Sequence, residues 1–196
     1  MSEPKIEFRE PPRGSRVEPP PAVPTGNDLA FMGDAEMRLA QDLLFFAYRD
    51  FTNAADVILA ELGLGRAHHR ALHFIGRNPG ITVSDLLSIL RITKQSLARV
   101  LNVLVEQAYV SQAPGRSDRR QRLLTLAPAG ATLERRLFES QRERLSAAYG
   151  EAGSAAVDGF RRVMRCIMDE TARAYIDTHD IDSAHSTNRP MRGRPA

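Results

Sequence analysis

The residues best placed to do chemistry lie on one face of a helix predicted over residues 93–108. At about 100° per residue, Gln95, Arg99, Asn102 and Glu106 share the face opposite an apolar stripe. The first turns carry the residues that suit nucleic acid: Thr93, Lys94, Gln95, Ser96 and Arg99. Gln, Arg and Ser side chains hydrogen-bond to base edges, and a helix N-terminus attracts phosphate. An ordinary solvated helix face is the competing interpretation.

Arginines gather in a loop shortly after this helix. Residues 113–121 contain Arg116, Arg119 and Arg120, and the wider stretch 91–122 has seven basic residues against two acidic ones, a net charge of +5. The whole chain has a net charge of only +3. A local positive field on a nearly neutral protein indicates contact with an anionic polymer, although a charged, solvated surface would also have this composition.

The elements around these residues have the order of a winged helix. A capping pattern at residues 82–85 begins a short helix to residue 90, a tight turn follows, and Thr93 caps the next helix. Residues 109–112 and 122–126 read as two strands that flank the arginine-rich loop. Such a fold places a recognition helix in the major groove and a basic wing in the minor groove.

The remaining helices contain more apolar surface than a winged helix can bury. They are predicted over residues 34–62, 66–77, 131–148 and 154–178, with glycines or prolines at their boundaries. We predict a mainly α fold with a small β-hairpin wing, in which residues 64–127 read DNA and the helices at 34–62 and 131–178 form a dimer. The folded domain spans residues 28–180. The proline-rich residues 1–27 and the polar tail 183–196 are expected to be disordered.

Three segments resemble the MarR family of winged-helix regulators. They are residues 80–86 (GITVSDL), residues 92–101 (ITKQSLARVL), and SDRR at 117–120 followed by LTL at 124–126. The resemblance implies a homodimer that binds double-stranded DNA at a pseudo-palindromic operator and is released by a small ligand or by thiol oxidation. It also implies that Arg120 enters the minor groove, with Arg119 beside it, and that Asp118 holds the wing by pairing with a neighbouring arginine. The segment APAG at 127–130 departs from the family pattern.

Two further groups of side chains could bind small ligands. Tyr48, Arg49, His68 and His69 could together hold a small aromatic or anionic effector, although a core tyrosine and an interhelical ion pair would also explain Tyr48 and Arg49. His69 and His73 have the i, i+4 spacing of metal or haem ligands, but their helix has no carboxylates and packing or phosphate contact explains them as well. We predict no metal and no cofactor. Cys166 lies among apolar residues and is expected to be a buried, inert thiol.

Several classes of protein are not expected. The sequence has no phosphate-binding glycine loop, no nucleophile elbow and no paired carboxylates in an apolar setting, so we predict that it is not an enzyme. No apolar run approaches the roughly 20 residues of a membrane span, and a single cysteine forms no internal disulfide, so a cytoplasmic location is expected. The predicted function is a ligand-responsive homodimeric repressor. A protein-interaction adaptor that keeps the fold without binding DNA is the alternative.

Overall fold

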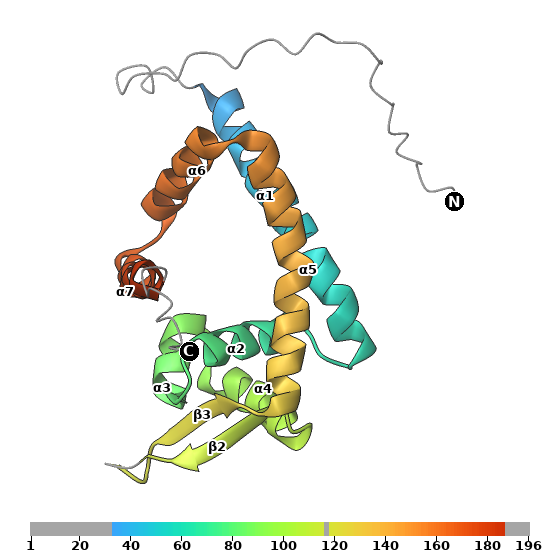
Figure 1. The fold of residues 1–196 in the computed structure, drawn as a ribbon, viewed down its shortest axis with the longest axis vertical. Coiled ribbons are helices and arrows are strands. Elements are labelled where there is room, and N and C mark those ends of the chain that lie inside the picture. Colours follow the sequence, from blue (N-terminus) through green and yellow to red (C-terminus); the bar gives the residue numbers. More distant parts are fainter. Residues whose placement is uncertain (1–32, 116–117, 187–196) are drawn as a thin grey trace, which may run out of the picture. The chain divides into compact units, whose positions relative to one another are not determined.

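The computed structural model of the chain describes residues 33–115 and 118–186, with the side chains of 180–186 not described. Its elements are α1 (Asp34–Glu61), α2 (Arg66–Arg77), β1 (Ile81–Thr82), α3 (Val83–Leu90), α4 (Lys94–Glu106), β2 (Val110–Pro114), β3 (Arg122–Leu126), α5 (Pro128–Ala152), α6 (Ser154–Ile167) and α7 (Glu170–Ser186) (Figure 1). The chain divides into two compact units, residues 1–45 and 46–196, so that α1 crosses the boundary. The described part of the first unit is the beginning of α1.

The helix-turn-helix is formed by α3 and α4, and both helices begin at the predicted caps. The hydroxyl oxygen of Thr82 accepts a hydrogen bond from the backbone N–H of Asp85 at 3.1 Å, and that of Thr93 accepts one from Ser96 at 3.1 Å. Each bond satisfies a backbone donor that has no partner within the helix. Arg91 ends α3 in the left-handed conformation, with a φ of 50°. The predicted short connection between the two helices is therefore confirmed.

The sheet has three antiparallel strands in the order β1–β3–β2, where the sequence indicated only a hairpin. In the hairpin Val110 pairs with Leu126 and Pro114 with Arg122. The additional strand is two residues long, and Ile81 of this strand pairs with Leu124. A segment of two residues is too short to show the alternating apolar and polar pattern of a strand. It forms a strand because β3, which is paired with β2, also pairs with it at Leu124.

A single apolar core holds α2, α3, α4 and the sheet together. We call this part of the chain, residues 64–127, the winged-helix head. The predicted seam of α4 is confirmed for Leu97, Val100, Leu101 and Leu104, all of which are buried. Val105 was expected in the same seam but is 38% exposed. It lies at the edge of the apolar stripe, where the helix has already turned away from the core.

Helix α5 leaves the head at a position that only glycine can occupy. A Cβ on Gly130 would overlap the carbonyl oxygen of Tyr109, and that same oxygen accepts a hydrogen bond from the backbone N–H of Ala127 at 3.0 Å. Pro128 stands in the first turn of α5, as expected. Leu133 and Leu137 then bury the beginning of α5 against the core of the head.

The C-terminal helices differ from the sequence prediction in their breaks. α5 continues to Ala152 and ends at Gly153, whereas the helix predicted over 154–178 is divided at Met168. Met168 has extended backbone angles, and the carboxylate of Asp169 accepts a hydrogen bond from the N–H of Ala172 at 2.9 Å, so that a new helix begins there. α7 continues to Ser186, beyond residue 183 where the tail was expected to begin. The remainder of that tail and the predicted N-terminal extension lie outside the described residues.

No described helix is long and apolar enough to cross a lipid bilayer.

Candidate nucleic-acid interface

The first turn of α4 presents its polar side chains outward. Thr93, Lys94, Gln95, Ser96 and Arg99 are all exposed. The hydroxyl of Thr93 also donates to the hydroxyl oxygen of Ser96 at 2.8 Å, so that these two side chains form a closed cap. Thr93 therefore has a structural role in starting the helix. Gln95 and Arg99 point away from the buried seam, in the orientation that contact with base edges requires.

A second contact fixes the turn in front of α4. The guanidinium of Arg70 on α2 donates a hydrogen bond to the carbonyl oxygen of Leu90 at 2.8 Å. This oxygen is at the C-terminus of α3, where helix carbonyls lack partners inside the helix. The sequence analysis missed Arg70 because nothing in its spacing indicates that it reaches a residue twenty positions away. Arg70 ties the supporting helix α2 to the helix-turn-helix.

The wing is a hairpin that is closed by backbone contacts. The N–H of Gly115 donates to the carbonyl oxygen of Gln121 at 3.0 Å, and the N–H of Gln121 donates to that of Asp118 at 3.1 Å. A Cβ at Gly115 would lie 2.6 Å from the carbonyl oxygen of Asp118, so the close approach of the backbone at these two residues requires glycine. Arg119 and Arg120 are exposed at the tip that this turn creates.

Asp118 shapes the turn of the wing through the backbone. Its carboxylate accepts a hydrogen bond from the backbone N–H of Arg120 at 2.9 Å. Arg116 lies outside the described residues, and the pairing of Asp118 with a neighbouring arginine stays a prediction. A bond to the backbone shapes the turn and leaves the charged end of Arg120 available.

The cations of the interface have no acidic partners within the described part of the chain. Lys94, Arg99, Arg119 and Arg120 form no ion pair there, while Arg66 on α2 is paired with Asp56 at 2.6 Å. An exposed cation without a local counter-charge is free to neutralise a phosphate. The arrangement is an exposed polar helix N-terminus and an exposed arginine tip on one rigid core.

The four predicted effector residues have partners of their own. His68 uses its Nδ1 atom to accept a hydrogen bond from the N–H of Gly65 at 3.0 Å, which caps α2. Arg49 forms an ion pair with the adjacent Asp50 at 2.8 Å. The ring of Tyr48 lies 5.7 Å from the guanidinium of Arg66. Burial lowers the pKa of His69, while the charge of Asp56 opposes that shift.

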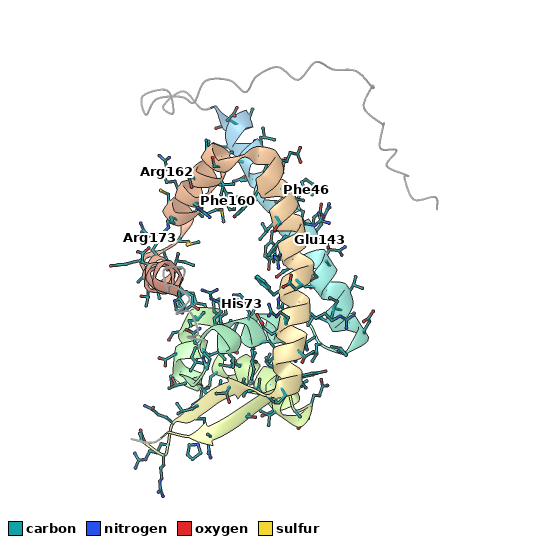
Figure 2. All side chains as sticks on the ribbon, viewed as in Figure 1. Phe46, His73, Glu143, Phe160, Arg162 and Arg173 are labelled. Carbon is teal, nitrogen blue, oxygen red and sulfur yellow. The ribbon has the colours of Figure 1, made fainter. Side chains whose placement is uncertain are left out.

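His73 is held neutral by its surroundings. Burial, followed by the charges of Arg77 and His69, lowers the pKa of His73 to about 4. Its Nδ1 atom lies 4.0 Å from a carboxylate oxygen of Glu134, and burial raises the pKa of that carboxyl. Figure 2 shows His73 on α2. No cluster of three or more metal-ligating side chains occurs among the described residues.

The thiol of Cys166 does not fit the sequence prediction. Cys166 is exposed on α6, where a buried and inert cysteine was expected. The neighbouring Ile167 is also exposed, at 60%. The apolar residues around the thiol therefore belong to the surface of this chain and not to its core.

Comparisons with known proteins agree with this architecture. A family model described as the MarR family matches residues 62–121. The HTH-type transcriptional regulator PetP of Rhodobacter capsulatus is 49% identical over 153 residues, which cover 78% of this chain and 92% of that protein.

Solved structures show the same fold. A SlyA-like transcription regulator from Listeria monocytogenes aligns with a TM-score of 0.55 at 16% identity and covers 79% of this chain and 97% of that one. A mutant MarR from E. coli complexed with operator DNA aligns with a TM-score of 0.55 at 20% identity and covers 68% of this chain and 96% of that one.

Proposed function

The chain belongs to the MarR family of transcriptional regulators, and from that premise we propose that it is a homodimer that binds operator DNA through α4 and the wing. The observation that carries the proposal is that two exposed cationic elements stand on one core and have no acidic partners among the described residues. Members of this family are regulators and not enzymes. An adaptor that has given up DNA binding would have no need to keep Lys94, Arg99, Arg119 and Arg120 free of acidic partners.

In the proposed complex α4 and the wing contact different grooves of the DNA. Gln95 and Arg99 extend from the exposed face of α4 and contact base edges in the major groove. Arg119 and Arg120 extend from the wing into the minor groove, whose negative potential attracts guanidinium groups. Lys94 and the N-terminus of α4 bind phosphate, and Thr93 and Ser96 hold that terminus in its helical form.

The dimer is proposed from the apolar side chains outside the head. On α6, Phe160, Val163 and Ile167 are exposed at 47%, 59% and 60% and share one helix face through their i, i+3, i+7 spacing. Phe160 packs edge-to-face on Tyr149 of α5, with ring centroids 6.3 Å apart, and is labelled in Figure 2. A contiguous apolar surface of this kind marks an interaction site, and a second copy of the chain is the partner that a two-fold operator requires.

A response to a small aromatic or anionic effector near Tyr48, Arg49, His68 and His69 stays a prediction. Arg49 and His68 are engaged by Asp50 and by Gly65, so a ligand would have to displace those contacts. The Arg49→Ala variant should lose ligand-induced release of DNA while its affinity in the absence of ligand changes by no more than a few-fold. Repression, as opposed to activation, is likewise a proposal.

The decisive experiment selects operator sequences from random DNA with the full chain and then compares two arginine variants. Arg99→Ala should cost about 1–3 kcal/mol per half-site on the selected operator and relax preference at one or two base pairs. Arg120→Ala should weaken operator and scrambled DNA more nearly alike, and the log–log salt slope should become shallower by about one per contact removed.

The matched control is Arg142→Ala on α5. Arg142 is an exposed arginine that pairs with Glu139 at 2.9 Å, outside the winged-helix head, so its loss should leave DNA affinity unchanged. Wild-type affinity in both Arg99→Ala and Arg120→Ala would remove the proposed DNA interface.

A further inference from the structure

Helix α7 contacts the segments on both sides of α3. At one end, the carboxylate of Asp169 lies 2.5 Å from the guanidinium of Arg91, the residue that ends α3. At the other end, Tyr175 and His179 bond to Asn78, which precedes β1 and the start of α3. Between these points Ile89 of α3 and Tyr175 of α7 line the same pockets. α7 therefore spans α3 along its length.

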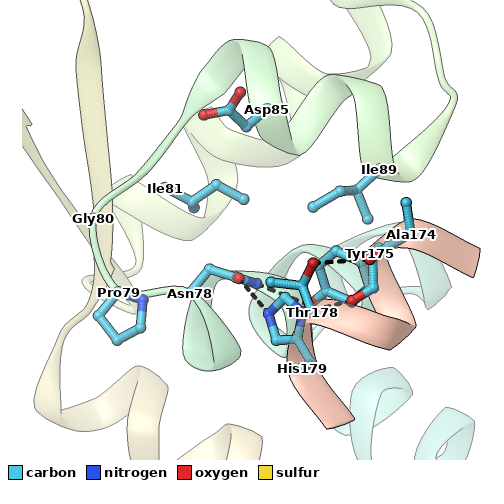
Figure 3. Close-up of a pocket in the computed structure, with 10 residues that line it drawn as sticks. All are labelled: Asn78, Pro79, Gly80, Ile81, Asp85, Ile89, Ala174, Tyr175, Thr178 and His179. Carbon is cyan, nitrogen blue, oxygen red and sulfur yellow. Dashed lines mark hydrogen bonds between the residues drawn. The ribbon is translucent and has the colours of Figure 1, made fainter. Parts of the chain in front are cut away.

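Asn78 is the centre of the second contact, which Figure 3 shows in close-up. Its side-chain nitrogen donates to the carbonyl oxygen of Phe74 at 2.8 Å and to the hydroxyl of Tyr175 at 3.0 Å. Because a carbonyl oxygen only accepts, the amide nitrogen must face Phe74. The amide oxygen of Asn78 then faces the Nε2 atom of His179, 2.8 Å away.

His179 adds a second contact between α7 and Asn78. Its Nδ1 atom lies 2.8 Å from the carbonyl oxygen of Tyr175, and its Nε2 atom lies 2.8 Å from the amide oxygen of Asn78. Because that amide oxygen only accepts, the Nε2 atom of His179 donates to it. Tyr175 and His179, one helical turn apart on α7, therefore both bond to the side chain of Asn78.

The described side chains around His179 are mainly aromatic and apolar. Its ring stacks on that of Tyr175 with centroids 4.0 Å apart, and the ring of Tyr175 meets Phe74 edge-to-face at 5.6 Å. The pocket beside it, of about 650 Å³, is lined from β1 and α3 by Ile81, Ile89 and Asp85. Asp85 is the charged residue of that lining apart from His179, and its carboxylate accepts a hydrogen bond from Thr82 at 2.7 Å.

We propose that α7 is a positioning clamp for the helix-turn-helix. The clamp holds α3 through Asn78 and Arg91, and α3 determines where α4 stands because the two helices share a turn. Loss of the His179 ring would remove one of the two bonds from α7 to Asn78 and would loosen the C-terminal end of the clamp. The consequence for operator affinity rests on the proposed DNA-binding function, whereas the docking of α7 does not.

The first test measures docking in the full chain without DNA. Backbone hydrogen exchange is recorded at one pH for the wild type and for His179→Ala. We expect exchange in α7 to become about three- to tenfold faster in the variant, which is the ratio expected for the loss of one hydrogen bond.

His179→Gln is the matched variant. Its amide can donate to Asn78, so the exchange of α7 should stay closer to that of the wild type than in His179→Ala. Unchanged protection of α7 in His179→Ala would overturn the proposal.

The second test examines the other end of the clamp. Asp169→Asn keeps an oxygen that can cap Ala172 but loses the charge that pairs with Arg91. Asp158→Asn is the control, because Asp158 forms an exposed pair with Arg161 within α6, at 3.4 Å. We expect about a three- to tenfold loss of affinity for selected DNA in Asp169→Asn alone, together with faster exchange in α7.

The two measurements separate the two hypotheses. Faster exchange in α7 with no DNA binding by any form of the protein would contradict the proposed function and leave the clamp standing. Unchanged exchange in Asp169→Asn, with the wild type bound normally to DNA, would contradict the clamp alone.

Discussion

The winged-helix head buries its large apolar side chains, whereas the outer helical segment of residues 138–167 leaves several of them exposed. In the head, Leu72, Leu97 and Leu124 are at most 1% exposed and meet one another in a single core. In the outer segment, Val163 and Ile167 are 59% and 60% exposed although their helix is equally regular. The head is thus complete as one chain, whereas the outer segment needs another surface. An interface, and not the internal core, accounts for its apolar sequence.

The largest expected effect is on the core of the head. Leu97→Ala should lower the free energy of unfolding by about 2–5 kcal/mol, because it removes a side chain that is 1% exposed and leaves a cavity. Val105→Ala in the same helix should cost less than about 1 kcal/mol, since Val105 is 38% exposed. Urea unfolding at constant protein concentration measures both. Equal losses would mean that α4 does not have the buried seam described here.

The second effect is on the outer segment. Val163→Arg would place a charge in the proposed dimer interface, so the dimer dissociation constant should rise at least about a hundredfold, or about 2.7 kcal/mol. Sedimentation equilibrium measures this constant, and far-UV circular dichroism should show an unchanged helix content. Arg162→Ala, the adjacent polar residue, is the control. If Val163→Arg remained a dimer, the interface would lie on another face.

The third effect is on the start of α4. Thr93→Ala removes the side-chain oxygen that accepts from the N–H of Ser96 and should destabilise the head by about 1 kcal/mol. Thr93→Ser keeps that oxygen and should remain close to the wild type. Thermal unfolding distinguishes the two variants. A loss of DNA affinity in Thr93→Ser with unchanged stability would show that the methyl group of Thr93 contacts DNA.

The smallest effect is on the pH dependence of stability and belongs to His73. Its folded pKa of about 4 lies below the ordinary value of 6.5, so the unfolded chain binds the proton more tightly. Stability should therefore be complete above about pH 6.5 and fall as the pH drops towards 4. Because the side chain is 40% exposed, screening by solvent keeps the slope shallow.

His73→Gln should flatten this slope in urea titrations between pH 4 and pH 7. The raised pKa of Glu134 acts in the opposite sense just above 4.5, because there the folded state holds its proton more tightly. Glu134→Gln is therefore the companion variant, and it should steepen the slope. A slope that is the same in His73→Gln and in the wild type would assign the pH dependence to another group.

Local signals in the sequence were sufficient for most of the head. The caps at Thr82 and Thr93 and the apolar spacing of Leu97, Val100, Leu101 and Leu104 each depend on neighbours within one or two turns, and all are confirmed. The same holds for the strand predicted over residues 122–126, whose bounds are those of β3. These features need no knowledge of distant residues, because capping and helical periodicity act over short sequence separations.

The sequence predicted which side chains of the candidate interface are exposed, but not every contact that these residues make. The exposure of Gln95, Arg99 and Arg120 follows from their opposition to a buried seam or from their place in a loop. The contact between Asp118 and the backbone of Arg120 could not be predicted, because a carboxylate in an arginine-rich turn has several donors within reach. The break at Met168 was missed because Asp169 is also compatible with the interior of a helix and becomes a cap only where α7 turns away.

The sequence by itself determined the two helices and the hairpin of the winged-helix head, the face of α4 that is buried and the concentration of positive charge around it. Only the tertiary structure decided which side chains join elements far apart in the chain: Arg70 at the end of α3, and Tyr175 and His179 at Asn78. The physical reason is the range of the interactions. Periodicity and capping are local, whereas a hydrogen bond across a hundred residues exists only after the core has brought its two partners together.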